Sequence, residues 1–215
     1  MRPAAARRLS SGRATSATPS RTRNRWGQGE RLRAEALEAA ARLLGELGTV
    51  EGLSLRAVAR EVGVAPASLY GHFADKSALV DALLDGITDR LLRLLAEAAA
   101  TVDGADPTTR IRAQLLAFCE FSLANPGLYR VMFAARPGQP GTPVRALADT
   151  LVDSLRACEV AGARLRLPAE GAARVLIVGT YGRLAISQAR RADDGEVDAV
   201  IDFADELLSV VFERA

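Results

Sequence analysis

The sequence has little of the chemistry that enzymes and metal sites require. It contains one histidine, two cysteines and one lysine in 215 residues. A lone histidine cannot complete a catalytic triad or a metal site with the residues around it. The sequence also lacks an H-E-x-x-H motif, a glycine-rich phosphate loop and a Cys–His set. A small helical enzyme therefore has little support, and we expect no cofactor and no bound metal.

Long apolar runs are also missing. No stretch of about 18 apolar residues occurs, so we expect no membrane span. The basic N-terminal region lacks the continuous apolar segment of a signal peptide, which predicts a cytoplasmic protein in a bacterium.

Cys119 and Cys158 have no C-x-x-C spacing. We interpret them as small buried hydrophobes, with a redox-sensing pair as the alternative.

Positive charge is concentrated at the N-terminus. The formal net charge is only +2, but residues 1–29 hold seven arginines and no acidic residue, so the rest of the chain carries −5. Residues 1–28 mix Arg, Ser, Thr, Ala and Pro without apolar periodicity, which predicts a disordered basic arm. Either this arm lies along DNA, or it is a solvated tail or the product of a start codon assigned too early.

The remaining chain shows helical periodicity throughout. Hydrophobic residues make up 49% of the sequence, enough to build a core. Apolar residues recur at helical spacing between cap residues, prolines and glycines, and no segment has a convincing strand pattern. We therefore predict an all-α fold of about nine helices. They cover about 30–47, 54–62, 66–73, 75–98, 106–125, 127–135, 142–161, 169–191 and 196–213.

The second and third predicted helices are short and joined by a glycine turn at Gly63-Val64, and Ser54 is the expected N-cap of the second. Two such helices form a helix-turn-helix, in which the second helix enters the major groove of DNA. Val58, Ala59 and Val62 on the first helix are expected to meet Leu69 and Phe73 on the second. This packing leaves short or polar side chains on the outer face of the second helix. The alternative is an ordinary exposed helix in an all-α protein.

Lys76 favours the DNA interpretation. It is the only lysine, and it stands in the first turn of the helix that Asp75 caps. A cation there opposes the helix dipole and costs roughly 0.3–1 kcal/mol. The placement makes better sense if a phosphate binds both Lys76 and the free backbone N–H groups of the helix start.

The run from Gly52 to Leu79 resembles the TetR family of bacterial regulators. Val58-Ala59, Gly63-Val64, Leu69-Tyr70, His72-Phe73 and Lys76 stand at the spacing of that family without a gap, and the resemblance covers about residues 30–80. Asn125–Phe133 looks like a segment common in one branch of it. The resemblance implies a DNA-binding domain at 29–75 and a ligand-binding and dimerisation domain at 76–215. It also implies a repressor that binds palindromic double-stranded DNA as a homodimer and is released by a small, largely apolar molecule.

The resemblance assigns roles within the helix-turn-helix. Tyr70, His72 and Lys76 match residues that touch phosphate, and the start of the second helix matches the base-reading positions. Ala65 departs from the Ser or Thr that is frequent there, which removes a helix cap and shifts base reading toward thymine methyl groups. The predicted DNA-contacting residues are Ser54, Arg56, Ala65, Pro66, Ala67, Ser68, Tyr70, His72 and Lys76.

Two glycines mark the helix predicted at 169–191. Gly179 and Gly182 each destabilise a helix interior by about 1 kcal/mol relative to alanine, which indicates that another helix packs closely there. The last two helices resemble the pair that forms the dimer interface of TetR proteins. The alternative is that both pack inside one subunit. The predicted interface residues are Gly179, Gly182, Ile186, Ile201 and Leu208.

An inducer pocket is expected between the DNA-binding module and those helices, by the same resemblance. The candidate lining is mostly apolar, which fits a hydrophobic ligand with few polar anchors. The alternatives are a solid core without a cavity and, for the whole protein, a helical interaction adaptor that does not bind DNA. The predicted pocket residues are Phe118, Cys119, Ser122, Met132, Phe133, Leu151, Leu155 and Tyr181.

Overall fold

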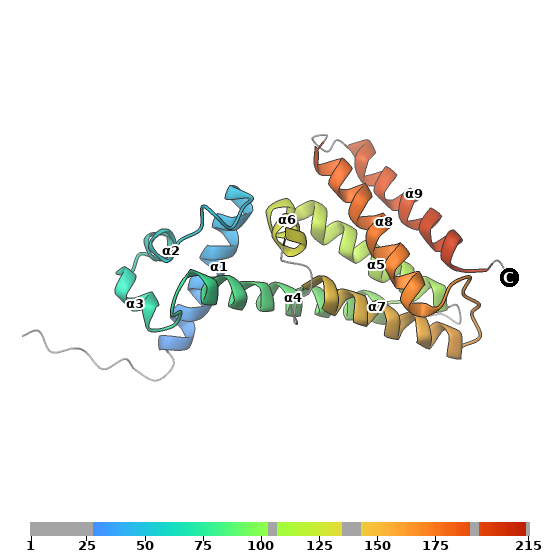
Figure 1. Cartoon of the computed structure of the whole chain (residues 1–215), viewed down its shortest axis with the longest axis horizontal. Helices are drawn as coiled ribbons and strands as arrows, with labels where there is room; N and C mark the ends of the chain where they lie inside the picture. The colour runs from blue at the N-terminus through green and yellow to red at the C-terminus, as the bar shows by residue number, and fades with distance from the viewer. Residues whose placement is uncertain (1–27, 103–106, 135–142, 190–193, 214–215) are drawn as a thin grey trace, which may run out of the picture.

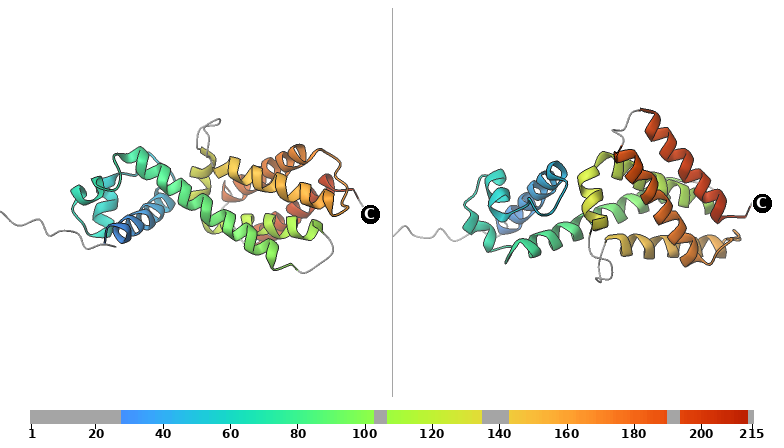
Figure 2. Two further views of the ribbon diagram at one scale, coloured as in Figure 1. Left: turned by 90° about the horizontal axis from the view of Figure 1, so that it is seen from below. Right: turned by 45° about the horizontal axis from the view of Figure 1, so that its top comes forward.

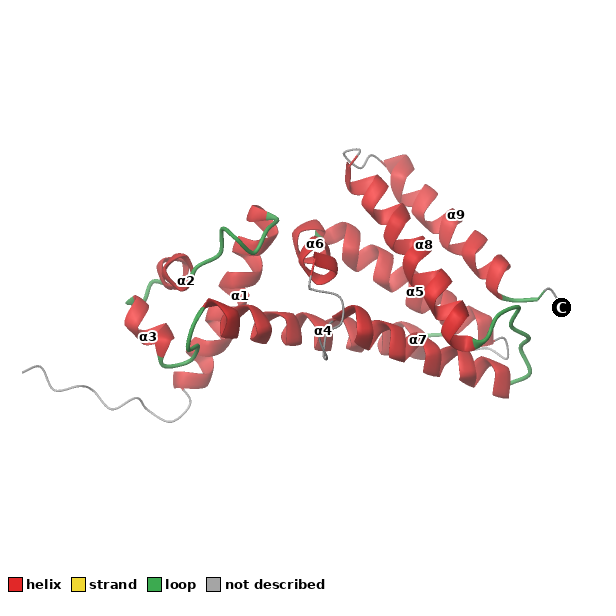
Figure 3. Cartoon of the chain, in the orientation of Figure 1, coloured by secondary structure: helices red, strands yellow, loops and turns green. Residues whose placement is uncertain are grey.

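The computed structural model describes residues 28–102, 107–134, 143–189 and 194–213. Within these ranges the regular secondary structure is helical (Figure 3), apart from one isolated bridge between Leu165 and Phe212. This confirms the predicted all-α fold. The helices are α1 (Gln28–Leu47), α2 (Leu55–Val62), α3 (Pro66–Tyr70), α4 (Lys76–Ala100), α5 (Pro107–Ala124), α6 (Pro126–Ala134), α7 (Pro143–Val160), α8 (Ala169–Ala189) and α9 (Asp194–Val211).

Two further predictions concern the N-terminal arm and membrane-spanning helices. The predicted basic arm, residues 1–28, lies outside the described residues except for Gln28, which begins α1. Among the described helices, none has both the length and the apolar composition that crossing a bilayer requires.

Several helices begin and end at the residues that the sequence indicated. The Ser54 hydroxyl accepts a hydrogen bond from the Ala57 N–H at 3.1 Å, and the Asp75 carboxylate accepts one from the Ala78 N–H at 2.9 Å. Each bond satisfies one of the backbone donors that a helix start leaves free. Gly48 follows α1 with a φ of 68°, a left-handed conformation that favours glycine.

Helix α3 is shorter than predicted. The sequence predicted a helix over about 66–73, whereas α3 ends at Tyr70. The N–H groups of His72 and Phe73 both donate to the Leu69 carbonyl oxygen at 2.9 Å, so the chain turns tightly after the helix. This turn brings Phe73 back into the core, where its side chain is 2% exposed. Helical periodicity alone does not reveal the turn.

Helix α4 connects the two halves of the molecule. Figure 1 shows it running from the module of α1, α2 and α3 into a bundle that contains α5, α7, α8 and α9, and both views of Figure 2 agree. In the bundle α4 packs along α5 and α7, while α8 and α9 lie against each other. Helix α6 packs against α1 and so forms a second connection between the module and the bundle.

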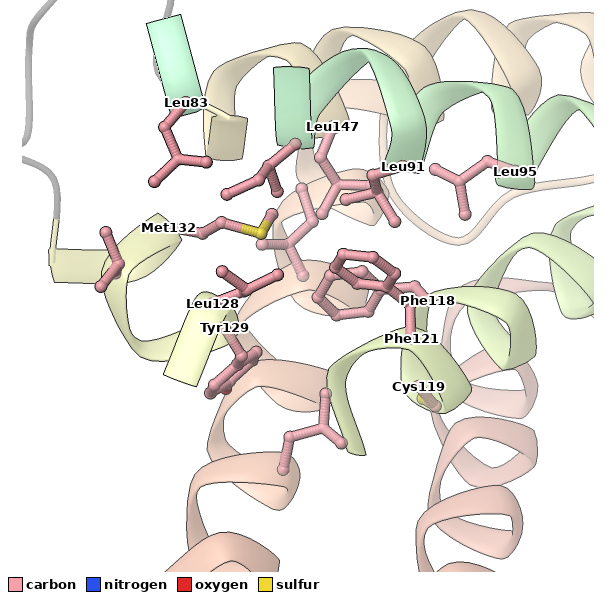
Figure 4. Packing of buried hydrophobic residues seen from close by; sticks show 14 of the residues in the cluster. Leu83, Leu91, Leu95, Phe118, Cys119, Phe121, Leu128, Tyr129, Met132 and Leu147 are labelled. Atoms are coloured by element: carbon pink, nitrogen blue, oxygen red, sulfur yellow. The ribbon is translucent and has the colours of Figure 1, made fainter. Parts of the chain in front are cut away.

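The bundle core fills the space between these helices. Figure 4 shows Leu91 and Leu95 from α4 pointing toward Phe118 and Phe121 from α5, with Met132 from α6 beside them. Each of these side chains is 5% exposed or less. The packing makes α4 part of the bundle core as well as part of the helix-turn-helix, so that a shift of the core side chains would act on α4.

Candidate nucleic-acid interface and ligand cavity

A compact apolar core fixes the angle between α2 and α3. Val58, Ala59 and Leu69 are fully buried, as the sequence predicted, and Val62 is half-buried and packs against the core. Phe73 completes this core, and the guanidinium of Arg33 on α1 lies 5.5 Å from the centre of its ring, within cation–π range. With Leu69 anchored inward, the opposite face of α3 must point to solvent.

The predicted base-reading residues lie together on that outward face. Ala65, Pro66, Ala67 and Ser68 are all exposed, and the side chain of Tyr70 is 52% exposed. A tyrosine exposed in this way offers both an aromatic face and a hydroxyl to a partner. No side chain caps the α3 start at Ala65, in agreement with the expected loss of a cap there.

The residues around α2 contribute differently to this surface. Arg56 is exposed in the first turn of α2. Ser54 is half-buried, and its oxygen is already the acceptor of the α2 cap, although the hydroxyl hydrogen remains available for donation. Ser54 therefore has a structural role that is independent of any DNA contact.

Lys76 has an internal partner that sequence reasoning missed. Its Nζ donates to the Glu51 carbonyl oxygen at 2.9 Å, which ties the start of α4 to the turn before α2. An ammonium group has three donors, so two remain for another acceptor. The two residues are 25 positions apart, and no sequence signal pairs a lysine with a distant backbone carbonyl.

His72 lies close in space to the first turn of α1. It is half-buried, and a Cβ added at Gly29 would stand 3.4 Å from its Cε1 atom. His72 therefore packs against the first turn of α1, and the described chain starts at Gln28, beside the helix-turn-helix.

The bundle encloses a small cavity between α4, α5, α7 and α8. Its volume is about 10 Å³, room for about one water molecule. Among the predicted pocket residues, only Phe118 and Leu151 line it. The full lining is Leu95, Gln114, Leu115, Phe118, Leu147, Leu151, Leu176, Ile177 and Thr180.

Four other predicted pocket residues are packed in the core outside this cavity: Cys119, Ser122, Met132 and Leu155. The Ser122 hydroxyl donates to the Phe118 carbonyl oxygen at 2.7 Å, so it is satisfied within its own helix. Burial raises the pKa of the Cys119 thiol to about 12, which keeps it protonated at neutral pH. Cys119 and Cys158 are both buried and outside any disulfide among the described residues, and the Cys158 thiol donates to the Pro107 carbonyl oxygen at 3.3 Å.

The last two predicted pocket residues belong to an aromatic cluster on the α6–α8 side. The ring centres of Phe133 and Tyr181 are 4.4 Å apart, and those of Tyr129 and Phe133 are 4.9 Å apart. The Tyr129 hydroxyl donates to the Tyr181 carbonyl oxygen at 2.8 Å. Burial raises the pKa of Tyr129, so the hydroxyl remains protonated and continues to donate.

Gly179 and Gly182 of α8 have different surroundings. A Cβ at Gly179 would stand 2.7 Å from one methyl carbon of Leu207 on α9, so this glycine permits close packing inside the subunit. Gly182 has nothing within 4 Å, and it lies one turn from Val178 and from Ile186, which are 61% and 51% exposed. Ile201 and Leu208 on α9 are half-buried. Packing inside one subunit therefore explains the glycine at position 179, whereas no contact among the described residues explains the glycine at position 182.

The comparisons with known proteins identify both halves of the chain. A family model described as bacterial regulatory proteins of the tetR family matches residues 36–83. A second, described as the C-terminal domain of tetracyclin repressor-like proteins, matches residues 111–211. A stretch of 100 residues is 36% identical to the nucleoid occlusion factor SlmA of Photorhabdus laumondii, covering 46% of this chain and 49% of the relative. The chain thus spans about half the length of that curated relative.

Two solved structures share the fold over most of the chain. A protein of unknown function from Rhodococcus sp. RHA1 is 30% identical with a TM-score of 0.71, covering 85% of this chain and 96% of the other. SmeT, the repressor of the multidrug efflux pump SmeDEF of Stenotrophomonas maltophilia, is 20% identical with a TM-score of 0.68, covering 85% of this chain and 91% of the other. At 20% identity the second similarity concerns the fold alone.

Proposed function

Because the chain belongs to the tetR family of bacterial regulatory proteins, we propose that it is a repressor that binds a palindromic operator as a homodimer and releases it when a small apolar molecule binds. The observation that carries the proposal is the exposed face of α3, where Ala65–Ser68 and the 52% exposed Tyr70 stand on a fully buried scaffold. On this proposal residues 29–75 bind DNA and residues 76–215 bind the ligand and dimerise.

Phosphate contacts position the protein on DNA. Tyr70, His72 and Lys76 lie around the end of α3 and the start of α4, and the two free donors of the Lys76 ammonium are available to phosphate oxygens. Arg56 adds a further exposed cation at the start of α2. Bases are read by Ala65–Ser68, largely through contact with thymine methyl groups.

The α8–α9 surface supports a homodimer. Val178, Gly182 and Ile186 recur every four residues along α8, which places them on one exposed stripe. The open space over Gly182 allows a second helix to approach closely, and a two-fold axis there pairs the stripe with itself. A two-fold dimer requires a palindromic operator, with recognition helices about 34–36 Å apart or a multiple of it.

Helices α4 and α6 supply the route from ligand to DNA. A ligand releases DNA only if it binds one conformation better than the other. Leu95 of α4 lines the bundle cavity, while the start of the same helix carries Lys76. The backbone of α6 packs directly against the backbone of α1, since a Cβ at Gly127 would stand 2.5 Å from the Gly45 Cα. A movement of the bundle is therefore transmitted at two points.

Selection from a random double-stranded DNA library tests the proposal. The purified protein should enrich palindromic sequences whose half-sites are spaced by a whole number of helical turns. Tyr70→Phe should weaken binding to all enriched sequences about equally, because phosphate contacts carry no base information. No enrichment above a scrambled library would favour a helical adaptor that does not bind DNA.

Sedimentation tests the dimer separately. Gly182→Leu should give monomers that bind the enriched operator poorly, because a leucine fills the space that the partner helix needs. Gly86→Leu is the matched control, since Gly86 is an exposed glycine of α4 with nothing within 4 Å. A wild-type monomer at micromolar concentration would reject the homodimer.

A further inference from the structure

Two buried oxygen atoms have no hydrogen-bond partner in the part of the chain that the structure describes. They are the amide Oε1 of Gln114 on α5 and the hydroxyl Oγ1 of Thr180 on α8. Their residues are 6% and 2% exposed, and both line the cavity between α4, α5, α7 and α8. Because buried polar groups are almost always bonded, two exceptions on residues that line one cavity require an explanation.

Other buried polar side chains of the bundle are satisfied. The Ser122 hydroxyl donates to the Phe118 carbonyl oxygen at 2.7 Å, and the Ser187 hydroxyl accepts from the Arg183 guanidinium at 2.8 Å. The helices therefore have the means to bond a buried hydroxyl locally, as Ser122 shows. At Gln114 and Thr180 this does not happen, and the two oxygens remain available to a third group.

Resting on the function proposed above, we propose that Gln114 and Thr180 are the polar anchors of the inducer site, and that the inducer is an uncharged, mainly apolar molecule with a hydroxyl group. Apart from these two residues, the cavity is lined only by Leu, Ile and Phe side chains. No titratable side chain lines it, so a charged ligand would lose its hydration without gaining a counter-ion.

The two anchors differ in their hydrogen-bonding chemistry, and the difference selects the ligand group. The Gln114 Oε1 atom can only accept, whereas the Thr180 hydroxyl can donate. A ligand hydroxyl placed between them donates its proton to Gln114 and accepts the proton of Thr180, so all three groups are satisfied. A carboxylate has no proton for Gln114, and a hydrocarbon satisfies neither residue.

The size of the cavity gives the ligand its regulatory effect. At about 10 Å³ the cavity accommodates the hydroxyl but not an apolar body. The body of the ligand must therefore displace lining side chains such as Leu95 on α4 and Leu151 on α7. The ligand then binds a widened bundle better than the closed one, which is the differential affinity that induction requires.

Calorimetric titration with three matched probes tests the proposal: 4-propylphenol, propylbenzene and 4-propylbenzoate. Wild-type protein should bind the phenol best and the benzoate worst. Gln114→Leu and Thr180→Val should each weaken phenol binding about tenfold, the effect of one lost hydrogen bond to a buried group. Neither change should weaken propylbenzene binding or lower the Tm, because the oxygens removed have no partner in the folded protein.

Thr150→Val is the matched control. The Thr150 hydroxyl donates to the Ala146 carbonyl oxygen at 2.9 Å and does not line the cavity, so this variant should bind the phenol as wild type does. Equal phenol affinity in all proteins, equal affinity of wild type for the phenol and propylbenzene, or no phenol binding up to its solubility would each overturn the proposal. Operator binding is measured without probe, so a failure of the DNA-binding proposal is seen separately.

Discussion

The candidate site of the helix-turn-helix lies on the outer surface of the protein, whereas the candidate site of the bundle lies in its interior. In the module, the apolar residues of α2 and α3 are buried, and the candidate contacts are what remains outside. In the bundle, the candidate anchors Gln114 and Thr180 are themselves buried, among residues with the same helical spacing as the core. A site on the outer face can be recognised from helical periodicity, whereas a site inside the core cannot.

Phe73→Ala should have the largest effect. Removing a fully packed aromatic side chain from the module core should lower the free energy of unfolding by about 3–5 kcal/mol. Urea denaturation measures this, and operator binding should be lost together with the module. Tyr70→Ala is the matched change on the outer face, and it should alter stability by less than about 0.5 kcal/mol while still weakening DNA binding. Similar destabilisation by both changes would remove the contrast between scaffold and contact face.

Gly127→Ala tests the joint between the two regions. The new Cβ would stand 2.5 Å from the Gly45 Cα and 2.6 Å from the Gly45 carbonyl oxygen, so backbone rather than a side chain must move. We expect a loss of about 1–3 kcal/mol in the free energy of unfolding.

Gly86→Ala is the control for that substitution. Gly86 lies inside α4 with nothing within 4 Å, so alanine there should stabilise by about 0.5–1 kcal/mol. If Gly127→Ala were as harmless as Gly86→Ala, α6 and α1 would not be in the tight contact that the proposed transmission uses.

Arg56→Ala and Lys76→Ala should separate contact from scaffold within the module. Each should lower the dependence of log affinity on log salt by about one unit, because each removes one phosphate-neutralising cation. Lys76→Ala also loses the bond to the Glu51 carbonyl oxygen, at a cost of about 0.5–1.5 kcal/mol, but it removes a cation that opposes the α4 dipole by about 0.3–1 kcal/mol. Its free energy of unfolding should therefore fall by no more than about 1 kcal/mol. An unchanged salt slope for either variant would remove that residue from the phosphate contacts.

The same comparison shows what the sequence can predict. The caps at Ser54 and Asp75 were predicted because a cap and its partner N–H are three residues apart. The bond from Lys76 to Glu51 was not, and neither was the shared cavity of Gln114 and Thr180, because these partners meet only through tertiary packing. The same reason explains Gly179: its unfavourable helix propensity was visible, but the α9 residue that approaches it was not.

The smallest predicted effect concerns an ion pair that joins α5 to α9. The Arg112 guanidinium donates two hydrogen bonds to the Asp205 carboxylate, at 2.6 and 2.8 Å. These bonds hold the pKa of Asp205 below its ordinary value. The pair therefore stabilises the fold at neutral pH, and the stabilisation is lost as the pH falls below about 3.9, the ordinary aspartate value, and through the lowered pKa.

A double-mutant cycle with Arg112→Met and Asp205→Asn isolates this pair. Both side chains are more than 40% exposed, so solvent screens them, and the coupling energy at pH 7 should be about 1 kcal/mol or less. It should decline as the pH falls below about 3.9 and through the lowered pKa of Asp205, because the protonated carboxyl no longer attracts the guanidinium. The pair Arg145–Asp149 on α7, at 3.7 Å and about 70% exposed, should show almost no coupling at neutral or at acid pH. A coupling for Arg112–Asp205 that persisted after Asp205 had been protonated, as followed by its carboxyl NMR shift, would mean that packing of the arginine stem, rather than charge, joins α5 to α9.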